Sequence, residues 1–234
     1  MQLFLTGASG FIGRAVVAEA ARRGHSFTTS PGEAQGMIHL APVTEGIETM
    51  IAAAPAARFV LISSLAVYDF LALPDRALLN ECSPIAPAGP YAQTKWAQEE
   101  VARRHATNLT ILRPGIVHGP GREWFHHLGM KLSATRWLCL APESPLPLIS
   151  LENCATAIVD AIGAPAATRN LIDDNPPPRG AYVEALAART TPRPVIHTIS
   201  WPTLKRFGAL GLGALHDLFN PRLLAARCKP LRYK

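Results

Sequence analysis

The chain has 234 residues, of which 48% are hydrophobic and 17% charged, a length that suits one domain or one domain with a small lobe. This apolar content and a mean hydropathy of +0.13 exclude a disordered chain. The net charge of +6 comes from basic residues spread along the sequence, which indicates a solvated basic surface or attraction to anionic substrates rather than a nucleic-acid groove.

The four cysteines are far apart and form no Cys-x-x-Cys pair, which disfavours both a zinc site and a disulfide scaffold; they are Cys82, Cys139, Cys154 and Cys228. The first apolar run, residues 3–5, is short and leads into glycines, so no secretory signal is expected. No run of about 18 apolar residues occurs, so no membrane span is expected. These features predict a cytoplasmic, reducing location.

Short apolar runs alternate with amphipathic helical patterns through the first half of the chain. Strands are expected at residues 2–6, 26–30, 37–41, 58–63 and 109–113, and helices at 10–23, 44–54 and 91–105. Strands that alternate with helices indicate a parallel sheet with helices on both faces. We therefore expect an α/β fold with a Rossmann-like, doubly wound parallel sheet.

The second half has a different composition, rich in Pro, Trp and His from Gly119 onward. We expect residues 1–118 to form the core and residues 119–234 a smaller lobe, with interleaving of the two within one domain as the alternative. Further helices are expected at 150–162 and 180–189, and a short strand at 170–172. Apolar and basic residues at helical spacing in 203–218 favour a docked C-terminal helix over a membrane-surface helix.

A glycine-rich segment, Thr6-Gly7-Ala8-Ser9-Gly10-Phe11-Ile12-Gly13, joins the first strand to the first helix. Gly7 permits a sharp turn, Gly10 lets a diphosphate approach the backbone, and Gly13 lets the helix lie close to the strand. The helix N-terminus then presents N–H groups and a partial positive charge to phosphates. The segment predicts a dinucleotide site, and an ordinary strand–helix turn is the alternative.

Three side chains suited to proton transfer follow in order along the chain. Ser64 closes a predicted buried strand, where open α/β sheets hold ligands. Tyr91 and Lys95 are four residues apart and share a helix face, so the ammonium favours the phenolate and Tyr91 can exchange a proton near neutral pH. A Tyr-x-x-x-Lys alone is more often a surface pair, but its occurrence after the glycine turn and Ser64 favours a catalytic site.

At this point the sequence resembles the extended short-chain dehydrogenase/reductases, the NAD(P)-dependent epimerase/dehydratase family, as a shortened member. The motifs that carry the resemblance are TGASGFIG (6–13), MIHLAP (37–42), RFVLISSLAVY (58–68), YAQTK (91–95) and LRPGIVHGPG (112–121). Weaker similarity lies at 148–159 and 222–233. The motifs are specific in the first half of the chain and loose beyond about Arg122.

The resemblance implies catalytic roles for Ser64, for Tyr91 as general acid/base, and for Lys95, which would also hold the nicotinamide ribose. It implies that residues 1–118 are a dinucleotide-binding core and residues 119–234 a substrate lobe. The implied cofactor-binding residues are Gly7, Ser9, Gly10, Phe11, Ile12, Gly13, Ser30, Leu40, Ala41, Pro42, Tyr91, Lys95, Pro114 and Ile116.

The sequence departs from the family after the second strand. Only residues 31–36 precede MIHLAP, too few for the family's helix, third strand and helix, so one strand of the sheet is expected to be missing and the adenine pocket open or rebuilt. Residues 28–31 supply no Asp or Glu for the adenosine ribose. The cofactor is therefore NADP or NAD, with NADP slightly favoured; Arg14 is the nearest candidate for a 2′-phosphate, and an exposed helix residue is its alternative.

Other residues bear on the substrate and on partners. Apolar Ile116 stands where nucleotide-sugar enzymes often carry Asn, which argues mildly against a sugar nucleotide. The adjacent His126 and His127 suggest a substrate pocket rather than a metal site, because nothing else in the sequence completes a ligand set. In the family the Tyr91 helix contributes to a dimer interface, so Trp96 is a candidate contact in a homodimer, with core burial as the alternative.

The function expected is an NAD(P)-dependent oxidoreductase that transfers a hydride between nicotinamide and a carbonyl or hydroxyl substrate. Within the family, an NAD-dependent epimerase or dehydratase is the first alternative, because the same Ser, Tyr and Lys begin both reactions. A non-catalytic dinucleotide-binding sensor or scaffold is the second, suggested by the missing strand and opposed by the retained Ser64, Tyr91 and Lys95. The expected partner is a small-molecule substrate, not nucleic acid.

Overall fold

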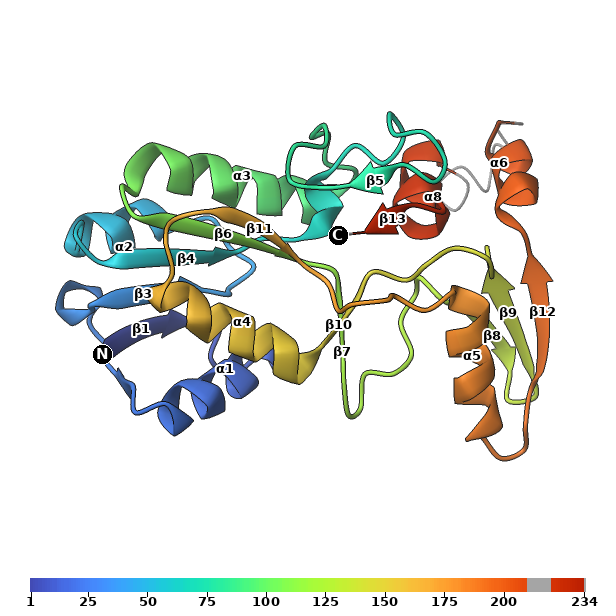
Figure 1. Ribbon diagram of the computed structural model, residues 1–234, viewed down its shortest axis with the longest axis horizontal. Helices are drawn as coiled ribbons and strands as arrows, with labels where there is room; N and C mark the ends of the chain where they lie inside the picture. Colours follow the sequence, from blue (N-terminus) through green and yellow to red (C-terminus); the bar gives the residue numbers. More distant parts are fainter. Residues whose placement is uncertain (210–219, 234) are drawn as a thin grey trace. The chain divides into compact units, whose positions relative to one another are not determined.

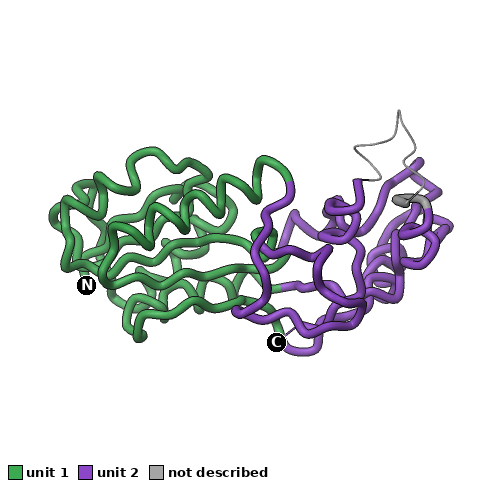
Figure 2. The backbone as a smooth tube through the Cα atoms, turned by 90° about the horizontal axis from the view of Figure 1, so that it is seen from above, with its two compact units in different colours: residues 1–67, 89–117, 149–173 green, residues 68–88, 118–148, 174–234 purple. Residues whose placement is uncertain are grey.

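The computed structural model describes residues 1–209 and 220–233 (Figure 1). The chain divides into two compact units, each built from separate segments (Figure 2). Unit 1 comprises Met1–Val67, Gly89–Val117 and Ile149–Asp173, and unit 2 comprises Tyr68–Ala88, His118–Leu148 and Asp174–Lys234. Unit 1 thus draws one segment from the second half of the chain, and unit 2 draws one from the first half.

Unit 1 contains a six-stranded sheet in the order β11-β6-β4-β3-β1-β2, and every pairing in it is parallel. Its strands are β1 (Gln2–Thr6), β2 (Ser26–Phe27), β3 (Gly36–His39), β4 (Arg58–Ile62), β6 (Leu109–Pro114) and β11 (Thr168–Leu171). Because all run in the same direction, their carboxyl ends meet at one edge of the sheet, where the loops that follow them gather.

Helices cover both faces of this sheet. Helices α1 (Phe11–Arg22) and α4 (Leu151–Gly163) lie on one face, and α2 (Ile47–Ala53) and α3 (Pro90–His105) lie on the other (Figure 1). Alternate strand residues supply the two cores: Ile38 and Val60 face α1 and α4, whereas Met37 and Phe59 face α2 and α3. Both faces are buried, so the strands read as continuous apolar runs, and the expected Rossmann-like α/β fold is confirmed.

The edge of the sheet at β2 carries the expected shortening. After β2 a 3-10 turn, η1 (Pro31–Glu33), leads directly into β3 on the other side of β1. The Gln35 N–H donates to the Gln2 carbonyl at 2.9 Å, which fixes this return against β1. Within the described residues no strand lies beyond β2, because the five residues between Ser30 and Gly36 cross β1 and leave no length for another strand.

Unit 2 contains small sheets and helices that the sequence only partly predicts. Strands β8 (Gly129–Ser133) and β9 (Arg136–Leu140) form an antiparallel pair, and β12 (Val195–Ile199) pairs parallel with β9. Strand β13 (Arg232–Tyr233) runs parallel to β5 (Leu78–Leu79). The helices of unit 2 within the described residues are α5 (Arg179–Ala188), α6 (Trp201–Ala209) and α8 (Pro221–Cys228). Unit 1 also contains η2 (Leu65–Val67) and most of the short strands β7 (Ile116–His118) and β10 (Leu148–Ser150).

The C-terminal half also shows where local patterns misplace elements. The short strand expected at 170–172 is β11, which joins the central sheet beside β6. The helix expected at 203–218 begins earlier, at Trp201, and is described as far as Ala209; residues 210–218 of that prediction lie outside the described part of the chain. Among the described helices, none combines the length and apolar character that crossing a bilayer requires.

Candidate active site

The glycine turn between β1 and α1 is held in close contact with its surroundings. Gly7 has φ +76°, and a Cβ there would lie 3.0 Å from the Ala41 nitrogen. A Cβ on Gly13 would lie only 2.1 Å from the Gly7 carbonyl oxygen, inside any allowed contact. The Gly10 N–H closes the turn by donating to that same oxygen at 3.1 Å. Glycine is therefore required at Gly7 for conformation and at Gly13 for space.

The N-terminus of α1 is open to an anion. Gly10 is its N-cap, no side chain among the described residues caps it, and its first turn has no acidic residue. The Arg14 guanidinium donates to the Ser9 carbonyl at 2.7 Å, so a cation lies directly against the loop. Uncapped N–H groups, the helix dipole and a nearby cation all favour phosphate at this position.

The segment that follows β3 lies beside the glycine turn. The Leu40 N–H donates to the Thr6 carbonyl at 3.3 Å, and the Ala41 N–H donates to Thr6 Oγ1 at 3.4 Å. The Cβ space above Gly7 is closed by Leu40 and Ala41. Leu40 and Ala41, two of the three residues that the family resemblance implies as cofactor-binding here, thus lie beside Gly7 although more than thirty residues separate them from it in sequence.

Lys95 brings α3 against the carboxyl end of β4. Its ammonium donates to the Ile62 carbonyl at 2.8 Å and to Gln98 Oε1 at 3.1 Å, with only 5% of the residue exposed. Burial lowers the pKa of Lys95 to about 8. Ser64 follows two residues after Ile62, and its Oγ accepts from the Ala66 N–H at 3.2 Å. Tyr91, one helical turn before Lys95, is 58% exposed.

A buried ion pair that the sequence analysis missed braces the same helix. Glu99 is fully buried and accepts from Arg113 in a bidentate pair, at 2.9 Å from Nε and 2.7 Å from Nη2. Its Oε1 also accepts from the Ser63 hydroxyl at 2.6 Å. The pair ties α3 to the ends of β4 and β6. The sequence did contain a signal for this pair. Glu99 lies on the buried face of a predicted helix and Arg113 inside a predicted buried strand, and buried charges need partners.

The end of β2 corrects one expectation. Glu33, in η1, accepts from the Thr28 hydroxyl at 2.8 Å, so an acidic side chain does stand beside the end of this strand. Ser30, implied as cofactor-binding, is the N-cap of η1. Sequence reasoning looked only at the residues directly after the strand, whereas the 3-10 turn folds Glu33 back onto it. Glu33 stands twenty residues after Gly13, the spacing at which a ribose-binding acid often occurs.

The remaining predicted residues also lie in unit 1. Pro114 ends β6, opposite Leu171 of β11, and the Gly115 N–H donates to the Leu171 carbonyl at 2.9 Å. Ile116 begins β7. Most of the predicted site residues therefore lie where strands of the parallel sheet end, which is the usual position of ligands in this architecture. They are the Thr6–Gly13 turn, residues 40–42, Ser64, Lys95 and Pro114. Trp96, the candidate dimer contact, is half-buried on α3.

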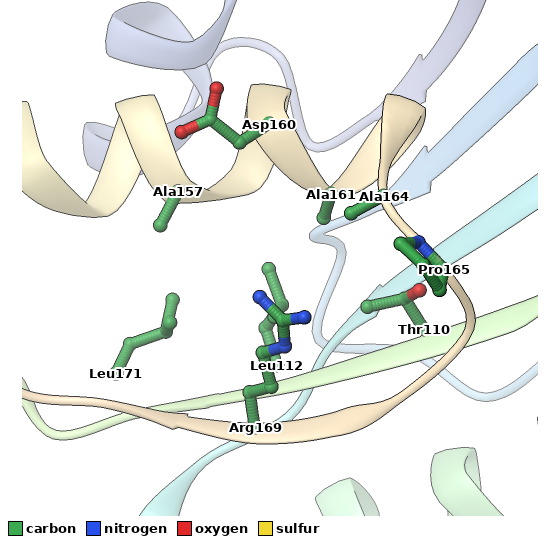
Figure 3. A pocket seen from close by; sticks show the side chains of 9 residues that line it. All are labelled: Thr110, Leu112, Ala157, Asp160, Ala161, Ala164, Pro165, Arg169 and Leu171. Atoms are coloured by element: carbon green, nitrogen blue, oxygen red, sulfur yellow. The ribbon is translucent and has the colours of Figure 1, made fainter.

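A separate cavity of about 120 Å³ lies between α4 and strands β6 and β11 (Figure 3). Apolar groups such as Leu112 and Ala161 line most of it, and the Arg169 side chain extends from β11 toward α4. The Asp160 carboxylate points away from the cavity, and it pairs with Arg23, the C-cap residue of α1. None of the predicted site residues lines this cavity, so it is distinct from the dinucleotide turn.

The paired histidines lie in unit 2. The His126 and His127 rings are 4.1 Å apart, and burial lowers the pKa of His127 to about 3, which keeps it neutral. An aromatic ring lies beside them: the Phe125 and His127 ring centroids are 6.3 Å apart. Among the described residues, no group of three His, Cys, Asp or Glu side chains is arranged to hold a metal ion.

A parallel, doubly wound sheet with a glycine turn into an uncapped first helix defines a Rossmann-like protein. Residues 33–136 match the model of the NAD dependent epimerase/dehydratase family. The resemblance to the extended short-chain dehydrogenase/reductases, expected from the sequence motifs, is thereby confirmed. No curated protein matches the chain significantly in sequence.

Solved structures share the fold at low sequence identity. A short-chain dehydrogenase/reductase superfamily protein from Agrobacterium tumefaciens with bound NAD is 20% identical, with TM-score 0.68 over 86% of this chain and 85% of that one. UDP-N-acetylglucosamine 4-epimerase from Bacillus cereus is 14% identical, with TM-score 0.67 over 86% and 85%. RMD from Pseudomonas aeruginosa complexed with NADPH is 20% identical, with TM-score 0.64 over 85% and 86%.

Proposed function

We propose that this protein is an NAD(P)-dependent oxidoreductase that moves a hydride between nicotinamide and a carbonyl or hydroxyl carbon of a small molecule. The observation that carries the proposal is the gathering of a glycine turn, a buried lysine and Ser64 where β1, β3 and β4 end. The match of residues 33–136 to a family described as NAD dependent supports it, as do the fold relatives that hold NAD or NADPH.

The chain's residues fit a dinucleotide in two respects. The first turn of α1 has no side-chain cap and no acidic residue, so its N–H groups and Arg14 are suited to a diphosphate. Leu40 and Ala41 border the same turn, and residues 40–42 would line the cleft. When bound, the nicotinamide would supply the carbon that accepts or releases the hydride.

Each catalytic side chain has a distinct part in the proposal. Tyr91 is exposed and exchanges a proton with the substrate oxygen. The Ser64 oxygen accepts from the Ala66 N–H, so its own hydrogen can donate to that substrate oxygen and hold it beside Tyr91. Lys95 holds a cation at the carboxyl end of β4, where it would orient the ribose hydroxyl groups of the nucleotide.

The choice between NAD and NADP rests on two opposed charges. Arg14 favours a 2′-phosphate, because it lies against the dinucleotide turn. Glu33 opposes one and suits free ribose hydroxyls, because its carboxylate stands at the end of β2. The presence of Glu33 removes the reason for favouring NADP, so both nucleotides remain proposals.

A second reaction within the same family is an epimerisation or dehydration in which the nicotinamide is regenerated. The description of the matched family names both activities, and one fold relative is a UDP-N-acetylglucosamine 4-epimerase. The two proposals differ in how the cofactor is held. An epimerase or dehydratase keeps NAD through purification, whereas an enzyme of net oxidation or reduction releases it after each turnover.

The test combines binding with turnover. Calorimetric titration of NADH and NADPH should give micromolar dissociation constants, and carbonyl compounds should then drive nicotinamide oxidation. Tyr91→Phe should lower kcat by about 100-fold or more with the dissociation constant changed less than twofold, whereas Tyr182→Phe, which removes a hydroxyl from unit 2, should leave both nearly unchanged. If neither NADH nor NADPH binds at millimolar concentration, the result would favour a non-catalytic scaffold instead.

A further inference from the structure

Gln98 occupies the centre of unit 1 between two parts of the proposed site. It lies on α3, three residues after Lys95, and is fully buried. On one side its Oε1 accepts from the Lys95 ammonium at 3.1 Å. On the other, its Nε2 donates to the Ala41 carbonyl at 3.0 Å and to the Val43 carbonyl at 2.7 Å. One amide therefore contacts both the predicted catalytic lysine and the segment that borders the glycine turn.

The orientation of this amide follows from its partners. Lys95 can only donate, and the carbonyls of Ala41 and Val43 can only accept. The amide oxygen must therefore face the ammonium and the amide nitrogen the two carbonyls. Turning the amide over would place its oxygen against two carbonyl oxygens and its nitrogen against a cation. The amide oxygen of Gln98 therefore faces a donor and its amide nitrogen faces two acceptors. Rotating the amide would break these hydrogen bonds.

The contacts continue from Gln98 to the glycine turn. His39 Nε2 lies 3.0 Å from the Val43 carbonyl, to which it must donate, so Nδ1 accepts from Thr6 Oγ1 at 2.9 Å. His39 is 1% exposed, and burial together with the Lys95 charge lowers its pKa, so it stays neutral. Thr6 is the last residue before Gly7. A continuous line of hydrogen bonds thus runs from Lys95 through Gln98, Val43 and His39 to the start of the glycine turn.

We propose that Gln98 is a positioning residue, which sets the Lys95 ammonium and the backbone of residues 41–43 in the arrangement that receives a nicotinamide dinucleotide. The identity of the ligand in this inference rests on the proposed function, whereas the contacts of Gln98 are those of the protein without nucleotide. Gln98 does not reach the reacting atoms; it acts through Lys95 and through the cleft wall.

The physical need for Gln98 comes from burial on both sides. Without its oxygen, the Lys95 ammonium keeps the Ile62 carbonyl as its described partner, and a buried cation with fewer acceptors is destabilised. Without its nitrogen, the Ala41 carbonyl loses a buried donor, and His39 is the partner that the described residues leave to the Val43 carbonyl. Two other titratable side chains belong to this part of unit 1: His39, whose pKa burial lowers, and Glu99, which pairs with Arg113 and Arg103.

Two substitutions separate the two halves of the amide. Gln98→Met keeps the length of the side chain and removes both hydrogen-bonding groups. Gln98→Glu keeps an acceptor for Lys95 but sets a carboxylate oxygen against the carbonyls of Ala41 and Val43. Gln93→Met is the matched control, because Gln93 is an exposed glutamine on the same helix.

The first readout uses the protein without nucleotide. The pKa of Lys95, followed by nitrogen NMR of the ammonium, should fall by about one unit in Gln98→Met and rise by more than about one unit in Gln98→Glu. Amide hydrogen exchange at Leu40 and Ala41 should accelerate in both variants, because both lose the donor to the carbonyls of 41 and 43. Gln93→Met should match the wild type in each measurement.

The second readout is nucleotide affinity by calorimetry. The dissociation constant of whichever nucleotide the wild type binds should rise about tenfold in Gln98→Met, the loss expected from one charge-assisted hydrogen bond in the site. Unchanged Lys95 pKa and exchange rates in both Gln98 variants would overturn the inference whatever the nucleotide does. Altered Lys95 pKa values together with no nucleotide binding by the wild type would instead overturn the proposed function, and the positioning role with it.

Discussion

Both units bury a cation, but they surround it differently. In unit 1 the Lys95 ammonium contacts the Ile62 carbonyl and the Gln98 side chain, where β4 ends. In unit 2 the Arg179 guanidinium donates to the carbonyls of Leu140, Ala141 and Arg227. Arg179 is 2% exposed and Lys95 is 5% exposed, so burial alone does not distinguish them.

The difference lies in what stands beside each cation. Within the described part of the chain, Arg179 joins segments of unit 2 through backbone carbonyls, a role that fixes loops in place. Lys95 lies at the carboxyl edge of a parallel sheet, where it donates to Ile62, two residues before Ser64, and it is on the same helix face as exposed Tyr91. A buried charge therefore marks a candidate active site only where the topology also brings ligand-binding groups to the same edge.

The largest expected effect tests how the core of unit 1 depends on its ion pair. Glu99→Gln removes the carboxylate that pairs with the buried Arg113 guanidinium, so the free energy of unfolding should fall by about 3–5 kcal/mol. Glu184→Gln, in an exposed pair of unit 2 at 3.2 Å from Arg193, should cost less than about 1 kcal/mol. Urea denaturation of both variants measures the contrast, and equal losses would show that the two pairs do not differ.

The two buried cations should separate stability from binding. Arg179→Met removes charge-assisted bonds to three carbonyls and should lower the free energy of unfolding by about 2–3 kcal/mol, while the dissociation constant of the nucleotide changes less than about twofold. Lys95→Met should instead raise that constant about tenfold or more. Denaturation and calorimetry on both variants test this, and weakened nucleotide binding by Arg179→Met would break the comparison.

Nucleotide affinity should depend on pH through Lys95. Because burial lowers the pKa of Lys95 to about 8, the ammonium persists at neutral pH and loses its proton as the pH rises through that value. The dissociation constant should be constant near pH 7 and rise about tenfold by one to two units above the Lys95 pKa. Calorimetry across this range gives the profile, and Lys95→Met should show a flat one.

The same proton has the opposite effect on stability. The unfolded chain holds it up to the ordinary lysine pKa of 10.5, while the folded chain releases it near 8. Between these values the unfolded state binds more protons, so this group makes the free energy of unfolding rise with pH. Lys95→Met should remove that contribution, which pH-dependent denaturation measures as a flatter slope.

The smallest expected effect concerns the edge of unit 1. Glu33→Gln removes the carboxylate at the end of β2 and should shift the preference between NADPH and NADH about three- to fivefold toward NADPH, the size of an exposed charge interaction. Arg14→Gln should shift it by a similar factor toward NADH. Competitive titration of the two nucleotides measures both ratios, and shifts of the same sign would contradict the assignment.

Local sequence patterns predicted unit 1 better than unit 2. The glycine turn, the buried strand at 58–62 and the helix carrying Tyr91 and Lys95 are specified by short-range rules of period and turn geometry. The hairpin of β8 and β9 was missed, and β11 was expected in the C-terminal lobe, because these short strands gain stability from partners rather than from a strong pattern of their own.

The amino-acid order by itself determined the alternation of strands and helices, the glycine turn and the helix face shared by Tyr91 and Lys95, because each depends on residues only a few positions apart. Tertiary structure decided what the site residues touch. The contacts of Lys95 with Ile62 and of Gln98 with Val43 join residues 33 and 55 positions apart. Such pairs depend on strand order and on how a helix packs across a sheet, which no local pattern encodes.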